Sequence, residues 1–404
     1  WIDNLKLRVS YGIVGNQNGI GNYTTLGLAD NKGYEFGNVF QMGYLPGKEL
    51  SNPNLKWEQS ATANFGVDFS FFNGRLNGTV EYYNTHTKDL LVKRSLNASL
   101  GYTTMLDNLG KTKSSGIDLS LNGDVVRTKE FTWTLGTNFS MYKNEIVRID
   151  DTLDENGKPA SQVAQGWIIG EPINVYYDYL IDGIFQYDDF DITRDGTGNL
   201  VYTLKNTYDS DNDGVADSPI NCGGEPGMVK VRDNNGDGKI TADDRVPIRK
   251  DPKFTLSLSS TWNWKGFDLF MDWYGVSGRK IKNGYLYEYN SGGSLRGKLN
   301  GVKVDYWTPF NPSNKFPRPS YSADPAYLSA IAIQDASYIR LRTLQLGYTF
   351  PTRLLKNTPI HKLRLYATAT NLLTFTEFKS YSPELTPGSY PESRQYVFGV
   401  NVSF

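Results

Sequence analysis

The chain lacks the residues that most often build a covalent or metal-bound core. It has one cysteine, Cys222, in 404 residues, which excludes an internal disulfide. Its two histidines, His86 and His361, lie far apart in the sequence, so a zinc site built on histidine is not expected. A formal net charge of −1 gives no overall field toward nucleic acid, and we expect no nucleic-acid partner.

Several sequence signals are also missing. No apolar run reaches about 18 residues, which excludes a membrane-spanning helix but not a membrane β-barrel, whose strands alternate. We find no nucleophile elbow, P-loop, dinucleotide fingerprint or metal-hydrolase histidine motif, and we predict that the chain is not an enzyme. The chain opens at Trp1 without a basic and apolar leader.

Aromatic residues and glycine are abundant. Aromatics make up 14% of the chain, with 27 Tyr and 20 Phe, and there are 40 Gly. Aromatic side chains favour strands and glycine favours turns, so the composition indicates an all-β fold.

Long segments alternate with a period of two residues. From Trp57 to Phe71 the odd positions are apolar apart from Gln59, while the even positions are polar or glycine. The same alternation recurs in Phe131–Met141, Phe254–Trp264 and the final stretch, "QYVFGVNVSF". The polar positions are mostly Ser, Thr, Asn and Gly, which favours the interior of a membrane barrel over the Lys- and Glu-rich surface of a soluble sandwich.

The connections between strands indicate two different rims. We predict long strands over residues 4–14, 55–72, 75–92, 111–124, 131–148, 252–264, 267–279, 337–350, 362–374 and 395–404. The linkers alternate between long loops and short turns such as Asn73–Gly74 and Lys265–Gly266. Short periplasmic turns and long extracellular loops are typical of a transmembrane antiparallel β-barrel.

Three local features refine this prediction. Aromatic residues crowd the short-turn rim like an interfacial girdle, namely Phe69, Phe71, Phe72, Phe131, Trp133, Trp262, Trp264 and Phe267. The apolar phase slips between Leu341 and Leu344, which predicts a β-bulge. The segment 170–186 also reads as a strand, and we expect it in an extramembrane sheet within the long loop 149–251.

Several segments in this order resemble the C-terminal part of SusC/RagA-type TonB-dependent outer-membrane transporters. They include "LKLRVSYGIVGNQNGIGNY", "NPNLKWEQS", "NLGKTKSSGIDLSL", "DGIFQ", "GMVKVRDNNGDGKITADDR" and "ASYIRLRTLQLGYTFP". The resemblance covers nearly the whole chain. It implies about ten strands of a 22-stranded barrel, with the N-terminal plug domain outside residues 1–404.

The resemblance also implies function and partners. Such proteins import bulky oligosaccharides or peptides through outer-membrane lipid, using TonB energy and a SusD-like surface lipoprotein. Their C-terminal strand carries alternating aromatics that the barrel assembly machinery reads. Three residues match that signal: Tyr396, Phe398 and Phe404.

The stretch "RDNNGDGKITADDR" has the spacing of a calcium loop. Hard oxygen ligands are needed at positions 1, 3, 5, 7, 9 and 12, with Gly at 6. The matching residues are Asp233, Asn235, Asp237, the carbonyl of Lys239, Thr241 and Asp244. Flanking Gly and Pro exclude paired EF-hand helices, so we expect calcium to be a structural staple rather than a sensor. The alternative is an unmetallated polar turn.

Further candidate sites lie in the long loops. A second acidic cluster precedes the first and would offer calcium the carboxylates of Asp209, Asp211, Asp213 and Asp217, unless it is a solvated acidic loop. Loop aromatics could stack on a ligand, although such rings more often pack the loop itself; they are Tyr285, Tyr287, Tyr306 and Trp307.

The sequence therefore predicts an outer-membrane nutrient transporter. One alternative is a soluble, secreted, calcium-stabilised β-domain that binds glycans. Another is a passive barrel or adhesin without TonB coupling.

Overall fold

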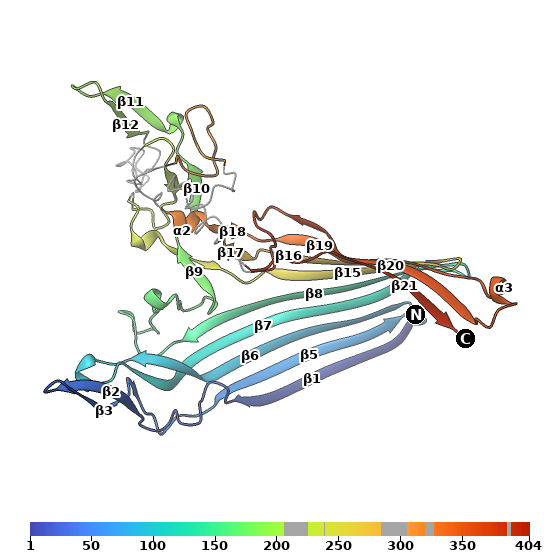
Figure 1. The fold of residues 1–404 in the computed structure, drawn as a ribbon, viewed down its shortest axis with the longest axis horizontal. Coiled ribbons are helices and arrows are strands. Elements are labelled where there is room, and N and C mark those ends of the chain that lie inside the picture. The colour runs from blue at the N-terminus through green and yellow to red at the C-terminus, as the bar shows by residue number, and fades with distance from the viewer. Residues whose placement is uncertain (206–224, 238, 284–304, 320–326, 386–388) are drawn as a thin grey trace. The chain divides into compact units, whose positions relative to one another are not determined.

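The computed structural model describes residues 1–205, 225–237, 239–283, 305–319, 327–385 and 389–404, and it consists mainly of β-strands (Figure 1). The chain forms two compact units: Trp1–Asn174 with Phe254–Phe270, and Val175–Lys253 with Met271–Phe404. The only α-helices among these residues are the single turns α2 (Leu328–Ile331) and α3 (Thr352–Leu355). No helix in the described part of the chain is long and apolar enough to span a membrane.

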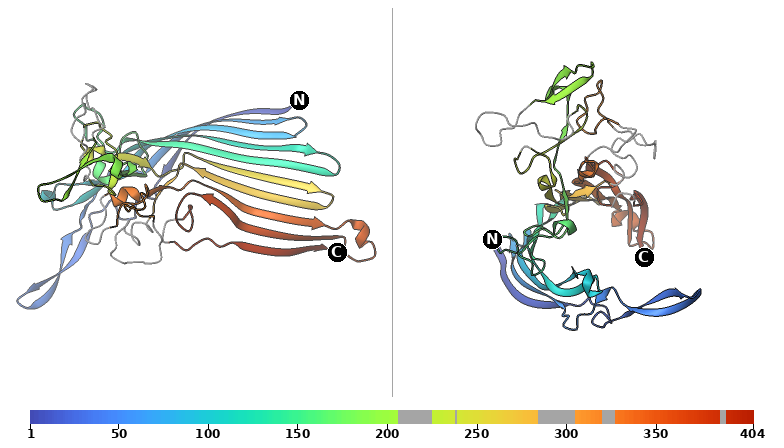
Figure 2. Two further views of the ribbon diagram at one scale, coloured as in Figure 1. Left: turned by 90° about the horizontal axis from the view of Figure 1, so that it is seen from above. Right: turned by 90° about the vertical axis from the view of Figure 1, so that its left-hand side faces the viewer.

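The first unit is built on one curved sheet, which the right-hand view of Figure 2 shows end-on as an arc. Its strand order is β1-β5-β6-β7-β8-β15-β16, and β4 (Glu49–Leu50) pairs with β7. The strands are β1 (Ile2–Asn16), β5 (Glu58–Phe71), β6 (Leu76–Ser95), β7 (Thr104–Arg127), β8 (Phe131–Arg148), β15 (Phe254–Trp264) and β16 (Phe267–Ser277). Neighbours from β1 to β15 are antiparallel.

The second unit contains the later part of β16 and three further long strands. They follow in the order β16-β19-β20-β21, with β19 (Tyr338–Thr349), β20 (Lys362–Thr376) and β21 (Gln395–Ser403). The register between β19 and β20 shifts between Leu341 and Thr343, which confirms the predicted bulge. The extra residue lies in the partner strand, where Asn371 adopts a positive φ of 54°.

All ten predicted long strands are present. The segment predicted at 131–148 is β8 with the same ends, and the others differ by a few residues, except that β7 starts at Thr104 rather than 111. A run of 24 residues in β7 is far longer than the ~5–6 residues of an ordinary strand. The period-two alternation therefore located each strand. It did not give every strand end, because a strand such as β7 continues beyond the segment that alternates.

One hairpin was missed. The first long connection contains β2 (Ala29–Phe36) and β3 (Val39–Pro46), which pair antiparallel across Gly37 and Asn38. Both turn residues have positive φ, 59° and 63°, as the tight hairpin turn requires. Its strands carry apolar residues on both faces, so the alternation that marks a half-buried strand is weak here.

The long connection between β8 and β15 contains small additional sheets. The predicted strand at 170–186 is two strands, β9 (Val175–Asp178) and β10 (Ile181–Ile184), which pair with β14 (Val246–Arg249) and β13 (Val229–Val231). Neither belongs to the sheets of long strands, as expected. A further hairpin joins β11 (Phe190–Arg194) to β12 (Leu200–Leu204), and β17 (Lys280–Lys282) pairs with β18 (Ile333–Asp335).

Candidate functional site

One face of the first unit's sheet is apolar and exposed. Strand register aligns its residues in rows, one of which runs through Val9, Phe65, Tyr82, Ile117 and Met141 on five successive strands. These five side chains are 40–73% exposed. Monomeric soluble proteins rarely expose so continuous an apolar surface, so this face is built to contact something other than water.

The height of the apolar face matches a lipid bilayer. On β8 every second residue from Phe131 to Met141 lies on this face, and all are apolar except Thr137. Ten residue steps of about 3.4 Å extend about 34 Å along the strand. At a tilt near 40° the band is roughly 26 Å high, close to the ~25 Å apolar band of membrane barrels.

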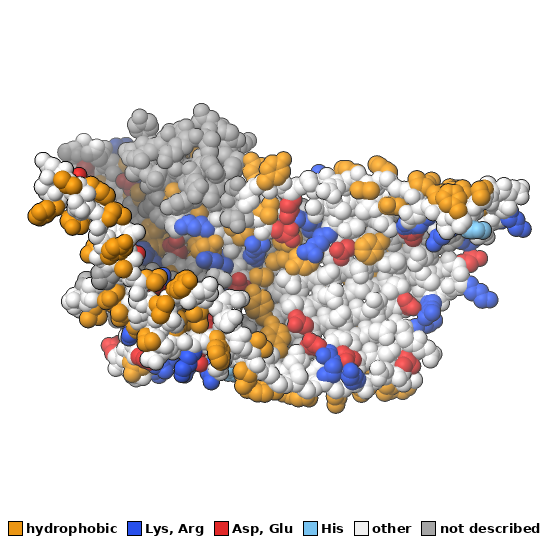
Figure 3. Space-filling model, turned by 60° about the horizontal axis from the view of Figure 1, so that its bottom comes forward, with side chains coloured by type: hydrophobic (Ala, Val, Ile, Leu, Met, Phe, Trp, Pro, Cys, Tyr) orange, Lys and Arg blue, Asp and Glu red, His pale blue; other side chains and the backbone are white. Residues whose placement is uncertain are grey.

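The opposite face is polar but carries little charge. One of its rows passes through Thr62, Thr85, Ser114 and Asn144, and Thr62 and Thr85 join their hydroxyls at 2.9 Å. A broad surface of this composition, white with scattered charged groups, is seen in Figure 3. Such a face suits the wet interior of a barrel.

A charged network crosses this polar face. Arg8 makes a two-point contact with Asp68, with Nε–Oδ2 at 2.8 Å and Nη2–Oδ1 at 2.9 Å, and its Nη2 also pairs with Glu81. Gly66 lies between Arg8 and Glu81 in the register. A Cβ at Gly66 would be 3.0 Å from the guanidinium, so glycine provides the space over which Arg8 reaches Glu81.

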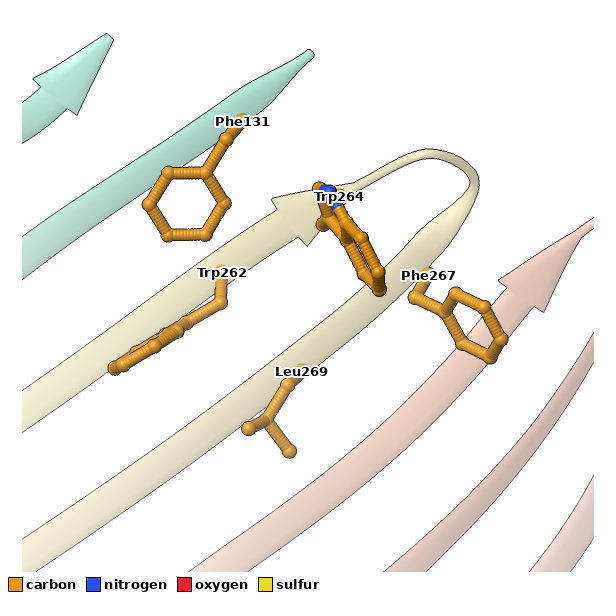
Figure 4. Close-up of a pocket in the computed structure, with 5 residues that line it drawn as sticks. All are labelled: Phe131, Trp262, Trp264, Phe267 and Leu269. Carbon is orange, nitrogen blue, oxygen red and sulfur yellow. The ribbon is translucent and has the colours of Figure 1, made fainter. Parts of the chain in front are cut away.

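Aromatic side chains gather at the short-turn rim, as predicted. A groove of about 420 Å³ is lined by side chains from β8, β15 and β16 (Figure 4): Phe131, Trp262, Trp264, Phe267 and Leu269. Trp133 and Trp262 lie opposite each other, and both indole N–H groups donate to the Ser260 hydroxyl, at 3.0 and 2.6 Å. Rings with a satisfied polar edge are typical of a membrane interface.

The residues of the predicted calcium loop lie together but bond mainly to one another. Asp233, Asn235 and Asp237 each accept a hydrogen bond from a backbone N–H two or three residues ahead. Asp244 is fully buried; its carboxylate accepts from the backbone N–H of Asn234 at 2.9 Å and of Thr241 at 2.7 Å. Among the described residues, Asp, Glu, His and Cys side chains form no cluster of three that could hold a metal.

Asp244 is electrostatically tuned by this position. Burial opposes its ionisation, but the backbone N–H donors of Thr241, Asn234 and Asn235 outweigh burial and lower the pKa of its carboxyl below the ordinary 3.8. Together with Thr241 it forms a capping box on the 3-10 turn Ala242–Asp244. Asp244, the residue predicted at position 12 of the calcium loop, therefore also holds the two ends of the loop together through its own hydrogen bonds.

The other predicted loop sites have different placements. The second acidic cluster, Asp209 to Asp217, and the ring residues Tyr285 and Tyr287 lie outside the described residues. Trp307 is 3% exposed, packs with Ile184, Val229 and Val231, and donates from Nε1 to the Gln186 side chain at 2.8 Å. This placement favours the packing role for Trp307 over ligand stacking, whereas Tyr306 is half-buried.

A second charged network, which sequence analysis missed, joins β19 to the β20–β21 loop. Arg340 is 3% exposed and pairs with Glu384 at 2.7 Å and with Glu392, and it donates to Ser382 at 3.3 Å. Burial opposes ionisation of the Glu384 carboxyl, but the hydrogen bond from the Tyr338 hydroxyl and the charges of Arg340 and Arg342 outweigh burial. The net effect lowers the pKa of Glu384 below its ordinary 4.5. The sequence did not reveal the Arg8 and Arg340 networks, because charged residues scattered along a strand do not show which side chains meet.

The final strand presents its aromatics as predicted from its alternation. Tyr396, Phe398 and Phe404 are all more than half exposed. On β21, Phe398 lies in register with Ala367 and Leu346, and Leu346 is also exposed. The exposed aromatics therefore belong to an apolar face of the second unit.

A sheet of long antiparallel strands, apolar and exposed on one face and polar on the other, defines the wall of a membrane β-barrel. Comparison with known proteins identifies which kind. Residues 1–372 match the family described as "TonB dependent receptor-like, beta-barrel". The chain belongs to this family, in its SusC/RagA type, and it forms part of an outer-membrane barrel with short periplasmic turns and long extracellular loops.

Individual relatives cover the whole chain. "TonB-dependent receptor P3" of Formosa agariphila is 30% identical over 421 residues, 99% of this chain and 39% of that protein. "TonB-dependent receptor SusC" of Bacteroides thetaiotaomicron is 27% identical over 100% of this chain and 38% of that protein. The structure titled "Structure of the RagAB peptide transporter" has a TM-score of 0.73 at 28% identity, covering 100% of this chain and 41% of that one. The chain thus spans about two fifths of the length of these relatives.

Proposed function

We propose that the chain forms the C-terminal part of an importer that carries bulky nutrients, oligosaccharides or peptides, across the outer membrane with TonB energy. The observation that carries this proposal is the likeness to the RagAB peptide transporter over the whole chain. The relative named SusC supports the same type of protein. The exposed apolar band argues against the soluble glycan-binding alternative, because a soluble domain would bury it. The proposed role is transport rather than catalysis.

The proposed partners are a SusD-like surface lipoprotein and the TonB complex. The whole protein would contact TonB through parts outside residues 1–404. Disrupting TonB in cells that carry the full-length protein should abolish uptake of labelled oligosaccharide or peptide mixtures. Uptake that persists without TonB would support the passive barrel instead. Affinity purification of the full-length protein should bring down a lipoprotein, and the class of mixture that is depleted identifies the substrate.

The proposed ligand contacts are limited by the loop structure. Tyr306 remains the candidate for ring stacking among the described residues, because Trp307 is enclosed by its neighbours. Tyr285 and Tyr287 are proposed from sequence alone. Substitution of Tyr306 by Ala should raise the substrate concentration at half-maximal uptake, and Tyr306→Phe should keep uptake close to wild type if the contact is stacking.

We also propose calcium as a structural staple of the loop from Asp233 to Asp244. The donor chemistry fits, because calcium takes carboxylate, amide and carbonyl oxygens and the loop offers these in calcium-loop order. Asp244 is already buried against the loop backbone, so a bound ion would add to a partly closed fold. Calcium, as a hard cation, would draw these oxygens inward and reduce the loop's freedom.

A calcium titration tests the staple. Calcium should raise the Tm of the full-length protein and protect residues 223–245 from protease, and Asp233→Ala should remove the protection. Asp211→Ala reports on the second acidic cluster in the same way. Loss of transport in EDTA without any change in protease protection would contradict the structural role.

A further inference from the structure

Three lysines lie beyond the end of the apolar band, on the same face of the sheet. On β8 the next same-face residue after Met141 is Lys143. On β7 the second after Ile117 is Lys113, and on β6 the third after Tyr82 is Lys88. The register joins them, because Lys113 lies opposite both His86 and Glu145 and Ser115 lies opposite Lys143. We call Lys88, Lys113, Lys143 and His86 the basic patch.

Lys143 and Lys113 lie within reach of the lipid head groups, and Lys88 lies one same-face step farther out. Each same-face step covers about 6.8 Å of strand, or roughly 5 Å along the membrane normal at a tilt near 40°. Lys143 and Lys113 are therefore about 5 and 10 Å beyond the last apolar row. The head-group layer is roughly 5–8 Å thick on each side, and a lysine stem can bend its ammonium toward it.

The sheet face opposite Lys113 and Lys143 is uncharged beside these two lysines. At the same level, the opposite face carries Thr85, Ser114 and Asn144, none of them charged. On the lipid-facing side Glu145 pairs with Lys143, so three lysines face one carboxylate among the residues named here. Lys88 and Lys143 are exposed and Lys113 is half-buried. A ligand for these cations would therefore approach from the membrane rather than from the barrel interior.

We propose that the basic patch binds the phosphate-bearing head group of a lipid in the outer leaflet. The end of β8 that carries Lys143 leads into the long extracellular connection to β15, and the ends of β6 and β7 that carry the other lysines lie at the same rim, which sets the leaflet. Lysine ammonium groups are compact point charges that suit phosphate oxygens, and the acyl chains of the same lipid would lie on the apolar rows immediately below. This assignment rests on the barrel and its orientation, and it does not depend on the transported substrate.

Lipid binding to the full-length protein in a nonionic detergent tests the assignment. Native mass spectrometry would measure the Kd for dioctanoyl phosphatidic acid, with dioctanoyl phosphatidylcholine and inorganic phosphate as comparison ligands. Each lysine near an anionic lipid surface contributes about fivefold in affinity, so Lys113→Gln with Lys143→Gln should weaken phosphatidic acid binding about 25-fold at low salt. Glu145→Gln should instead tighten it.

A matched control separates a site from general charge. Lys205→Gln with Lys315→Gln removes the same charge from exposed positions in the outer loops and should leave the Kd within twofold of wild type. Equal weakening by both pairs, or no weakening by the patch variant, overturns the proposal. Inorganic phosphate binding as tightly as the lipid would overturn the choice of a lipid. An unchanged Tm confirms that each variant is folded.

Discussion

Arg8 of β1 and Asp68 of β5 form a two-point ion pair across the polar face of the sheet, with Nε–Oδ2 at 2.8 Å and Nη2–Oδ1 at 2.9 Å. Thr79 donates to the same carboxylate at 3.0 Å, and Arg8 continues to Glu81 on β6. The network therefore joins three strands on the face opposite the apolar band. A planar guanidinium suits this task because it can serve two carboxylates at fixed angles.

Replacing Arg8 by Leu should lower the Tm of the detergent-solubilised protein by a few degrees. The change leaves Asp68 and Glu81 without their shared cation, and each is about one-third exposed or less. The effect is modest because water still reaches these groups. Adding Asp68→Asn and Glu81→Gln removes the stranded charges and should recover part of the loss. A triple variant less stable than Arg8→Leu would contradict this account.

Arg340→Met should have a larger effect than a change at its neighbour Arg342. The Arg340 side chain is 4% exposed and pairs with Glu384 and Glu392, whose side chains are 27% and 24% exposed, so its loss leaves two partly solvated carboxylates without this cation and should cost about 1–3 kcal/mol. Arg342 is 41% exposed and lies 3.7 Å from Glu384. Thermal unfolding and protease cleavage within residues 377–394 measure both. Equal losses for the two variants would show that the network does not hold the loop.

Asp244→Ala should loosen the loop that begins at Asp233. The carboxylate accepts from two backbone N–H groups and completes a capping box, and its removal leaves these donors without an acceptor at a cost of about 1–3 kcal/mol. The neighbouring Asp243 is exposed and provides the control. Limited proteolysis without calcium should cut Asp244→Ala faster than Asp243→Ala. The same rate for both would show that Asp244 does not close the loop.

The loop should also lose stability in acid. Because the folded pKa of Asp244 lies below the ordinary 3.8, its stabilising contribution is complete above that value and is lost as the pH falls through the folded pKa. Pepsin cleavage of the loop should therefore become faster as the pH is lowered below about 4. Asp244→Asn should be cut readily across that range, with a weaker dependence on pH. An unchanged pH dependence in that variant would assign the effect to another group.

The amino-acid sequence by itself determined the strands and their two faces. Period-two alternation found all ten long strands because a strand that separates lipid from a wet interior must alternate along its whole membrane-crossing length. The short turns at Asn73–Gly74 and Lys265–Gly266 then set which rim carries loops. The same alternation did not find β2 and β3, because a hairpin with apolar residues on both faces has no such period.

Tertiary structure decided which side chains meet. Asp68 and Glu81 follow Arg8 by 60 and 73 residues along the chain, and only the register brings the three side chains together. The role of Trp307 also depended on packing. The sequence cannot distinguish an aromatic loop residue that stacks on a ligand from one that fills a core, and the structure buries Trp307 in a core. Sequence periodicity fixes the side to which a residue points, whereas strand register and loop packing fix its neighbours, and those neighbours determine its chemistry.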